Sequence, residues 1–418
     1  MSLRTLAFAS ACALALAASS ALAETNVTIL HVNEVAAAKT LWDQIAADYN
    51  AAHPGVKVQF KYLENEAFKA KLPTMLQSDD RPDLFYSWAG GVMLAQDKAG
   101  LLKDVSADLA DVESTMSATA VNAFKVDGKV VGVPFEMGEV AFYYNKKLFA
   151  QAGVKAEDIK GWDDFLGAVK QLKAAGITPI VVGAGEKWPM HFYYAYLVVR
   201  IGGDGALVDA KANKDGGFKN ATLVEAGKRL HELAALDPFQ PGYLSTSHAQ
   251  SAGVFGDGKA AMDLMGPWLL GMQAPNSASG KGLPEDDIGI LSFPIVPGGK
   301  GNATDTMGGV NGFLVSKSAP AAAVDFLKFF SQEKYAKEAA ATGAYIPVVK
   351  GAATTITDPL QRRLADDLAA STYHQNYLDQ DLGPSVGRVI NDVSVAVAAG
   401  QMTPEAAAAA IQEAADQQ

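Results

Sequence analysis

Three short motifs place a tryptophan within two residues of glycine or proline, each next to the end of a predicted strand or the start of a predicted helix. They are Trp-Ala-Gly-Gly at residues 88–91, Trp-Pro at 188–189 and Gly-Pro-Trp at 266–268. A flat indole ring packs against apolar C–H faces, and neighbouring amides and carboxylates bond to hydroxyl groups. Sugars present both kinds of surface. The three motifs therefore suit the binding of a carbohydrate.

Motifs for catalysis or cofactor binding point away from an enzyme. The complete loop G-x-x-x-x-G-K-[ST], the loop G-x-G-x-x-G and the zinc motif H-E-x-x-H are absent, and although His231-Glu232 begins the last, residue 235 is Ala. We also expect no serine nucleophile elbow, which is a sharp turn between a strand and a helix. The six His are scattered, so we expect neither a metal site nor a cofactor. A carboxylate pair for glycoside hydrolysis stays open, because 46 acidic residues allow many pairs.

The positions of these motifs depend on a repeated alternation of strands and helices. Strand, helix, strand order predicts a parallel sheet with helices on its faces, and ligands bind at the carboxyl ends of such strands. Predicted strands cover 27–32, 56–62, 82–86, 140–144, 177–182, 260–265 and 287–293. Predicted helices cover 41–49, 66–77, 162–174, 193–199, 221–236, 319–331, 360–371, 384–399 and 404–414. The fold class is α/β with a helical C-terminal part.

Length and charge limit the architecture and the partners. The chain has 418 residues, and a single core stops growing near ~250–300 residues, so we expect two lobes. The net charge of −11, without runs of Lys and Arg, argues against binding to nucleic acid.

Residues 1–23 have the pattern of a secretory signal peptide. Arg4 precedes an apolar stretch at 6–18, and Ala-Leu-Ala at 21–23 is typical of a cleavage site, so we expect cleavage after Ala23. A membrane anchor and a lipid attached to Cys12 are the alternatives, but the apolar stretch is short and continues past Cys12. Cys12 would leave with the signal, so no disulfide is expected. We expect a periplasmic protein that is not inserted into the membrane.

Taken together, several segments resemble the family 1 extracellular solute-binding proteins, the sugar-binding components of ABC importers related to maltose-binding protein. The segments are Arg-Pro-Asp-Leu-Phe-Tyr-Ser-Trp-Ala-Gly-Gly at 81–91, Ala-Gly-Leu-Leu-Lys-Asp at 99–104, Asp-Gly-Lys-Val-Val-Gly-Val-Pro at 127–134, Tyr-Asn-Lys at 144–146, Gly-Pro-Trp at 266–268, Gly-Gly-Val-Asn-Gly-Phe at 308–313, residues 323–330 and Tyr-Ile-Pro at 345–347. Their order and spacing cover nearly the whole chain after residue 23.

The resemblance implies a periplasmic-binding-protein fold of two lobes joined by three crossovers, which closes over its ligand by a hinge. It places crossovers near 132–134, 261–264 and 312–316. The expected N-terminal lobe is 24–132 plus 266–312, and the expected C-terminal lobe is 133–265 plus 313–418. The resemblance also implies a monomer that delivers its sugar to the permease subunits of an ABC importer.

The expected ligand contacts combine the three tryptophans with polar side chains near strand ends and in a late loop. They are Asn33, Glu34, Trp88, Glu136, Trp188, His191, Trp268, Asn311, Tyr377 and Asp379. Each has an ordinary alternative as a core residue, a solvated loop residue or a hinge residue. Trp42 and Trp162 are expected in the cores.

The ligand itself stays open. The maltose-type pattern has a charged pair just after the tryptophan of the first lobe, whereas Ala-Gly-Gly follows Trp88 here, which favours other di- or oligosaccharides such as α-galactosides or xylo-oligosaccharides. Ferric ion is an alternative, because Tyr143-Tyr144 and Tyr193-Tyr194 are adjacent pairs. A polyamine-binding protein, a secreted glycoside hydrolase and an export chaperone are further alternatives.

Overall fold

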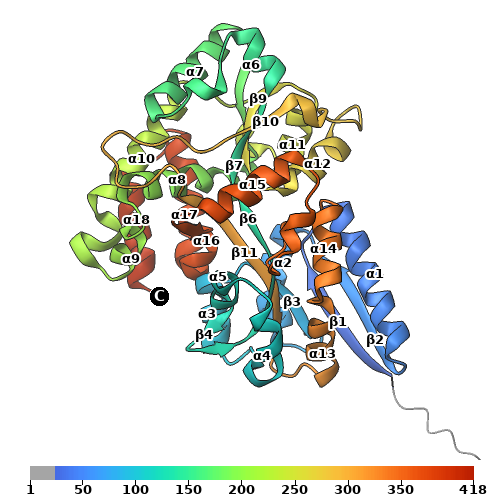
Figure 1. The fold of residues 1–418 in the computed structure, drawn as a ribbon. Coiled ribbons are helices and arrows are strands. Elements are labelled where there is room, and N and C mark those ends of the chain that lie inside the picture. The colour runs from blue at the N-terminus through green and yellow to red at the C-terminus, as the bar shows by residue number, and fades with distance from the viewer. Residues whose placement is uncertain (1–23) are drawn as a thin grey trace, which may run out of the picture.

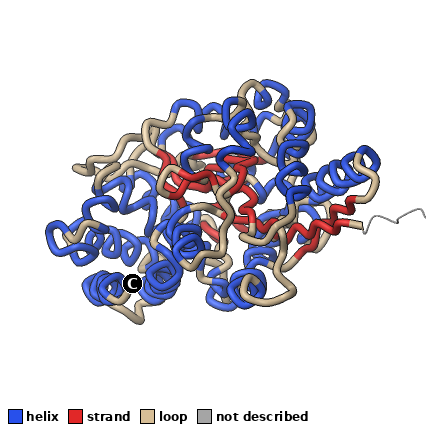
Figure 2. The backbone as a smooth tube through the Cα atoms, turned by 90° about the horizontal axis from the view of Figure 1, so that it is seen from below, coloured by secondary structure: helices blue, strands red, loops and turns tan. Residues whose placement is uncertain are grey.

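The structure is a computed structural model that describes residues 24–418, so the predicted signal peptide and Cys12 lie outside the described residues. The chain forms two α/β lobes, each with its own sheet and core (Figure 1). Seen from below, the strands run through the centre and helices surround them (Figure 2). The predicted two-lobe α/β fold is confirmed.

The first lobe contains a six-stranded sheet in the order β12-β11-β3-β1-β2, with β6 paired to β11. Its strands are β1 (Thr25–His31), β2 (Val56–Tyr62), β3 (Leu84–Ser87), β6 (Gly132–Glu139), β11 (Thr306–Val315) and β12 (His374–Asn376). β1 pairs in parallel with β2 and β3, whereas β11 is antiparallel to β3 and β6. The ends of β1 and β3 therefore lie at one edge of the sheet, which faces the second lobe.

Helices with one apolar side cover this sheet. They are α1 (Ala36–Ala52), α2 (Asn65–Met75), α3 (Gly90–Lys98), α4 (Ser106–Ser114), α5 (Ala118–Ala123), α13 (Ala321–Phe330) and α14 (Glu333–Ala341), and a small hairpin of β4 (Lys125–Val126) and β5 (Lys129–Val130) lies beside them. Four-residue spacing buries Leu41, Ile45 and Tyr49 of α1. Trp42 is fully buried between Phe60 and Phe135, as predicted for a core residue.

The second lobe contains a four-stranded sheet in the order β10-β7-β9-β8. Its strands are β7 (Ala141–Asn145), β8 (Thr178–Val181), β9 (Ala260–Met265) and β10 (Ile288–Leu291). Its helices are α6 (Lys146–Ala152), α7 (Trp162–Ala174), α8 (Trp188–Gly202), α9 (Ala206–Lys211), α10 (Ala221–Ala234), α11 (His248–Gly256), α12 (Trp268–Asn276), α15 (Pro359–Ala370), α16 (Leu378–Asp381), α17 (Gly383–Ala398) and α18 (Pro404–Asp416). The predicted core position of Trp162 is confirmed, because its side chain is fully buried.

The two hydrophobic cores divide the chain at positions that differ from the predicted lobe boundaries. β10 pairs with β7, so 288–291 belongs to the second lobe and not to the first. α13 packs with the first core through Ala323, Phe326 and Leu327, so this segment belongs to the first lobe and not to the second. Strand pairing decided the first assignment and the packing of an apolar helix face decided the second, and both involve distant segments of the chain.

The crossovers consequently differ as well. The chain passes between the cores where β6 continues into β7 near Val140, along β11 between Met307 and Val310, and again near Ala352. The expected crossover at 261–264 is wrong, because β9 is buried entirely in the second core. Within residues 24–418, no helix has the length and apolar character needed to cross a membrane.

Candidate ligand-binding site

An open cavity of about 140 Å³, measured as the space open to the centres of water molecules, is lined by residues of both lobes. This is roughly ten times the ~10–15 Å³ that one water needs on the same measure, so the cavity can hold a small organic molecule. All ten residues expected to contact a ligand line this cavity: Asn33, Glu34, Trp88, Glu136, Trp188, His191, Trp268, Asn311, Tyr377 and Asp379. Their contact with a ligand stays a prediction.

Aromatic rings form one wall of the cavity. The rings of Trp188 and Trp268 lie 6.3 Å apart, and those of Trp268 and Tyr377 lie 6.5 Å apart. Phe192 stacks on Tyr377 at 5.7 Å. The indole of Trp268 folds back over Gly266, where any Cβ would overlap the ring. The Gly-Pro-Trp motif therefore sets the direction of this tryptophan through the missing side chain of glycine.

Charged and polar side chains form the opposite end. Lys69 of α2 lies 3.5 Å from Asp379 of α16 and 5.5 Å from the centre of the Trp88 ring. Burial raises the pKa of Asp379, but the charge of Lys69, together with hydrogen bonding from Asn391, outweighs burial and holds that pKa below its usual range. Asn391 also donates to Asp379, at 3.4 Å. Asp379 is thus ionised and almost fully buried beside the cavity.

His191 of α8 belongs to the same end. It is fully buried, and neither of its ring nitrogens has a hydrogen-bond partner among residues 24–418. Burial is the main reason that its pKa is lowered. A neutral imidazole offers one donor and one acceptor, which is the pair of functions that a hydroxyl group also has. Buried polar groups without partners are costly, so His191 is poised to bond to a polar ligand.

The sheet of the first lobe contributes a carboxylate held by two donors. Glu136 and Asn311 are paired across β6 and β11, and the irregularity of the ladder falls just after Asn311. Tyr86 and Asn311 both donate to Oε1 of Glu136, at 2.9 and 2.7 Å. Burial raises the pKa of Glu136. The side-chain oxygens of Asn311 and Tyr377 are buried without a partner among the described residues, so they too can bond to a ligand.

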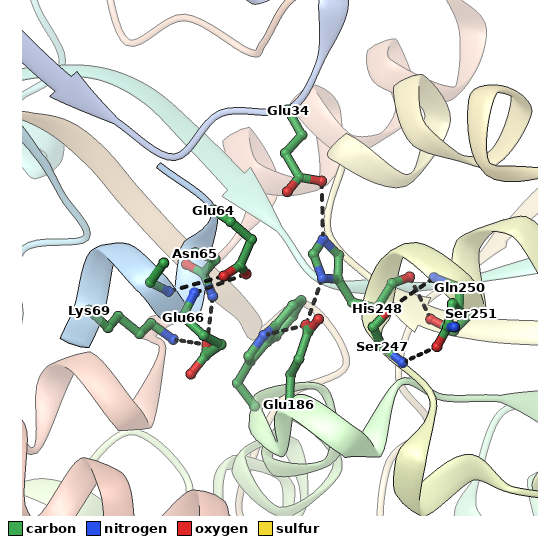
Figure 3. A network of polar contacts seen from close by, with 12 residues as sticks. Glu34, Glu64, Asn65, Glu66, Lys69, Glu186, Ser247, His248, Gln250 and Ser251 are labelled. Atoms are coloured by element: carbon green, nitrogen blue, oxygen red, sulfur yellow. Dashed lines mark hydrogen bonds and ion pairs between the residues drawn. The ribbon is translucent and has the colours of Figure 1, made fainter. Parts of the chain in front are cut away.

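The rim of the cavity is built around His248 at the first turn of α11. Its Nδ1 lies 2.7 Å from Glu186, at the end of the turn Ala184–Glu186, and its Nε2 lies 3.7 Å from Glu34 of the first lobe (Figure 3). Glu34 also accepts from the Tyr62 hydroxyl at 2.7 Å, and Glu186 accepts from the Trp188 indole at 3.2 Å. We call Tyr62, Glu34, His248, Glu186 and Trp188 the rim network.

Asn33 has a local role as well. Its Oδ1 accepts from the backbone N–H of Val35 at 2.9 Å, and its own N–H donates to His31 Nδ1 at 3.2 Å. The loop after β1 is therefore rigid where it enters the cavity.

Sequence reasoning missed Lys69, Tyr86 and His248, which line the cavity, and Glu186 behind it. Tyr86 follows two apolar residues of β3 and is two residues before Trp88, so its place near a strand end was a usable signal. Lys69 and His248 lie on helices without any motif, so no local pattern singles them out.

The rival interpretations find no support at this site. Tyr143, Tyr193 and Tyr194 are fully buried in the second core, and none of the four adjacent tyrosines lines the cavity. No group of three or more His, Cys, Asp and Glu in residues 24–418 is arranged to hold a metal ion.

The expectation that there is no serine nucleophile elbow meets one match of sequence letters. Residues 383–387, Gly-Pro-Ser-Val-Gly, do contain the letters G-x-S-x-G. They form the first turn of α17 and follow the short helix α16, whereas a nucleophile elbow needs a strand before the serine. Ser385 therefore lacks the setting of a nucleophile.

Comparison with known proteins gives the family. The family described as bacterial extracellular solute-binding protein matches residues 34–337. This is more than half of the chain, and the protein therefore belongs to that family.

Similar proteins include two curated relatives and a solved structure. An uncharacterized ABC transporter extracellular-binding protein of Pyrococcus horikoshii is 25% identical over 60% of this chain and 57% of its own length. A multiple sugar-binding protein of Streptococcus mutans is 24% identical over 66% of this chain and 64% of its own length. Both matches span less than two thirds of the relative. A solved chitin oligosaccharide binding protein is 26% identical, has a TM-score of 0.85, and the match covers 94% of this chain and 98% of that one.

Proposed function

We propose that the protein is the substrate-binding component of an ABC importer and that it captures a di- or oligosaccharide in the cavity between its lobes. One observation carries the proposal: aromatic rings and unpartnered buried polar atoms face the same cavity, and they come from both lobes. Trp188, Trp268 and Trp88 supply flat apolar surface. His191, Asn311 and Tyr377 supply hydrogen-bonding atoms that a sugar hydroxyl matches. The names of the sugar-binding relatives support the same ligand class.

Binding would favour the closed arrangement of the lobes. A ligand shifts a conformational equilibrium only by its differential affinity for the two states. A sugar ring can contact Glu136 and Asn311 of the first lobe and Trp268 and His191 of the second at once only when the lobes are close. Closure would then present one surface, formed by both lobes, to the permease subunits.

The cellular setting is part of the proposal. Export through the N-terminal signal, with cleavage after Ala23, would place a monomeric protein in the periplasm, where it would pass the sugar to the permease. The protein acts without catalysis. The three carboxylates that line the cavity support this, because each has partners of its own. Asp379 pairs with Lys69, Glu136 is held by Tyr86 and Asn311, and Glu34 is held by His248 and Tyr62.

A ligand screen tests the proposal. Thermal unfolding is measured with mono-, di- and trisaccharides, amino acids, polyamines and Fe(III), since a ligand at 100 times its Kd adds ~2.7 kcal/mol of stability. We expect a rise in Tm with one group of saccharides and no release of reducing ends on incubation. If Tm rises only with Fe(III) or a polyamine, that compound and not a carbohydrate is the ligand. Release of reducing ends would show that the protein is a glycoside hydrolase.

A further inference from the structure

His248 is placed between carboxylates that come from different lobes. Glu34 follows β1 of the first lobe, whereas Glu186 and His248 belong to the second. The side chain of His248 is only 10% exposed, and those of Glu186 and Glu34 are 17% and 24% exposed. Figure 3 shows the imidazole between the two carboxylates, with one ring nitrogen directed to each. The contact with Glu34 is a direct ion pair between the lobes at the rim of the cavity.

The surroundings of His248 favour its charged form. Burial opposes the charge, but the hydrogen bonds and charges of Glu186 and Glu34 outweigh burial and raise the pKa of His248 to about 9. Asp263 of β9 faces His248 from the sheet below, and Lys39 of α1 lies near Glu34 on the other side. The contact with His248 is in turn the largest reason that the pKa of Glu34 is lowered. His248 and Glu34 thus carry opposite charges at neutral pH.

We propose that His248 is a positioning residue that holds the rim of the cleft closed by drawing Glu34 of the first lobe towards Glu186 and Trp188 of the second. It acts through its neighbours. Glu186 receives the Trp188 indole N–H and the imidazole on the same oxygen, so the position of His248 also sets the position of an aromatic ring of the cavity. The ring of His248 lies 5.1 Å from that of Trp188 and supports it from the side.

The pH range of this effect follows from the directions of the shifts. His248 has a higher pKa in the closed arrangement than its ordinary 6.5, so its contribution is complete below pH 6.5 and is lost as the pH rises through about 9. Glu34 has a lowered pKa, so its contribution is complete above its ordinary value of 4.5 and is lost below that. The ion pair between the lobes is therefore complete between about pH 5 and 7 and weakens towards pH 10.

A distance measurement tests the role without any ligand. Spin labels are attached to the exposed positions Lys57→Cys on β2 and Lys170→Cys on α7, in a Cys12→Ala background that removes the single native cysteine. Distances are recorded by pulsed dipolar spectroscopy at pH 7 and pH 10. We expect the wild type to have a smaller population of the short distance, which marks the closed arrangement, at pH 10 than at pH 7. In His248→Gln this population should be small at both pH values. Glu34→Gln, which leaves the buried His248 in place, should behave in the same way.

The matched control is His53→Gln. His53 also pairs with a carboxylate at 3.7 Å, but its partner Asp325 belongs to the same lobe. This variant should keep the wild-type distances at pH 7. If His248→Gln and Glu34→Gln also keep them, the proposal is overturned.

The effect on ligand binding rests on the proposed function and is measured separately. With the saccharide found in the thermal screen, His248→Gln should bind about tenfold more weakly at pH 7, within the usual range of coupling between sites, and its affinity should vary less between pH 7 and 10. Equal affinities and equal pH profiles in wild type and His248→Gln would overturn the role. If no saccharide binds to the wild type but the distances change as expected, the proposed ligand is wrong and the role of His248 stands.

Discussion

Lys69 and Asp379 lie 3.5 Å apart at the polar end of the cavity, although 310 residues separate them in the sequence. Lys69 comes from a helix of the first lobe, and Asp379 comes from the late segment that follows β12. Burial opposes the charge of Lys69, but Asp379 and Glu66 outweigh it and raise its pKa. The pair therefore stays charged in a place where either group alone would be costly.

Removing this pair should weaken both binding and stability. In Asp379→Asn, Lys69 still forms an ion pair with Glu66, at 3.2 Å, but loses the one with residue 379. The side chain of residue 379, beside His191, also becomes uncharged. We expect roughly tenfold weaker saccharide binding and a loss of about 1–3 kcal/mol in the free energy of unfolding, measured by calorimetry and urea unfolding. Asp209→Asn breaks the exposed ion pair with Lys214 and should leave the saccharide affinity and the free energy of unfolding nearly unchanged. Unchanged affinity in Asp379→Asn would place the ligand elsewhere in the cavity.

The aromatic wall should contribute most of the affinity for a sugar. Trp268→Ala removes a half-buried ring that lies between Trp188 and Tyr377, and we expect binding to weaken by roughly tenfold or more. Trp268→Phe should recover part of the affinity that is lost in Trp268→Ala. Trp162→Phe, in the second core, should lower Tm without changing the affinity. Titration calorimetry separates these outcomes, and equal affinities for wild type and Trp268→Ala would contradict the proposed wall.

A glycine at the first turn of α3 allows the late segment to reach the first lobe. A Cβ at Gly91 would lie 2.6 Å from the backbone N of Gly383 and 2.7 Å from the carbonyl of Asp381. Gly91→Ala should therefore cost about 1–3 kcal/mol and displace Asp379 from Lys69. Gly167→Ala is the matched control, because a Cβ there meets nothing within 4 Å and the helix α7 should gain up to ~1 kcal/mol. If the two variants have similar free energies of unfolding in urea, the backbone of residues 381–383 can move aside for a methyl group at residue 91, and the prediction is wrong.

Two buried groups should give pH effects of opposite sign. Burial, and then the charge of Lys39, lowers the pKa of His31 to about 4. Between pH 6.5 and 4 the unfolded chain therefore binds a proton at His31 that the folded protein does not bind. Relative to wild type, His31→Gln should gain stability as the pH falls from 6.5 to 4. Urea unfolding across this range measures the difference, and a constant difference would contradict the prediction.

Glu139 provides the opposite case. Burial and then Asp367 raise its pKa to about 8, so the folded protein holds a proton that the unfolded chain releases above pH 4.5. The neutral form stabilises the fold below pH 4.5, and this contribution is lost as the pH rises through 8. Glu139→Gln should therefore gain stability relative to wild type between pH 4.5 and 8. The same urea series tests it, and a difference that falls with pH would reverse the assignment.

The site residues that could be predicted from the sequence have a local signal. Trp88, Trp188 and Trp268 lie within two residues of glycine or proline at element ends, and Asn311 lies in a glycine-rich strand. The carboxyl ends of parallel strands meet at one edge, so residues at such ends are brought together whatever the details of the packing. Asn33, Glu34 and the three tryptophans follow strands of the parallel pairs β1–β3 and β8–β9 and line the cavity for this reason. Glu136 and Asn311 lie within the antiparallel pair of β6 and β11.

Lys69 and His248 had no such signal. Both lie on helices, and what matters about each is a partner on a distant segment, Asp379 for Lys69 and Glu34 for His248. In the sequence, the glycines after Trp88 mark the end of a predicted strand and depart from the maltose-type pattern. Their role as the place where residues 381–383 pack is visible only in the folded chain.

The sequence by itself determined the order and type of the strands and helices, the two-lobe α/β class and the residues that stand at strand ends. These properties follow from hydrophobic periodicity and from the conformational limits of glycine and proline, which act over a few residues. The tertiary structure decided which sheet β10 and β11 join, where the chain crosses between the lobes, and which charges meet at Lys69 and His248. Those outcomes depend on contacts between segments hundreds of residues apart, and no local pattern contains that information.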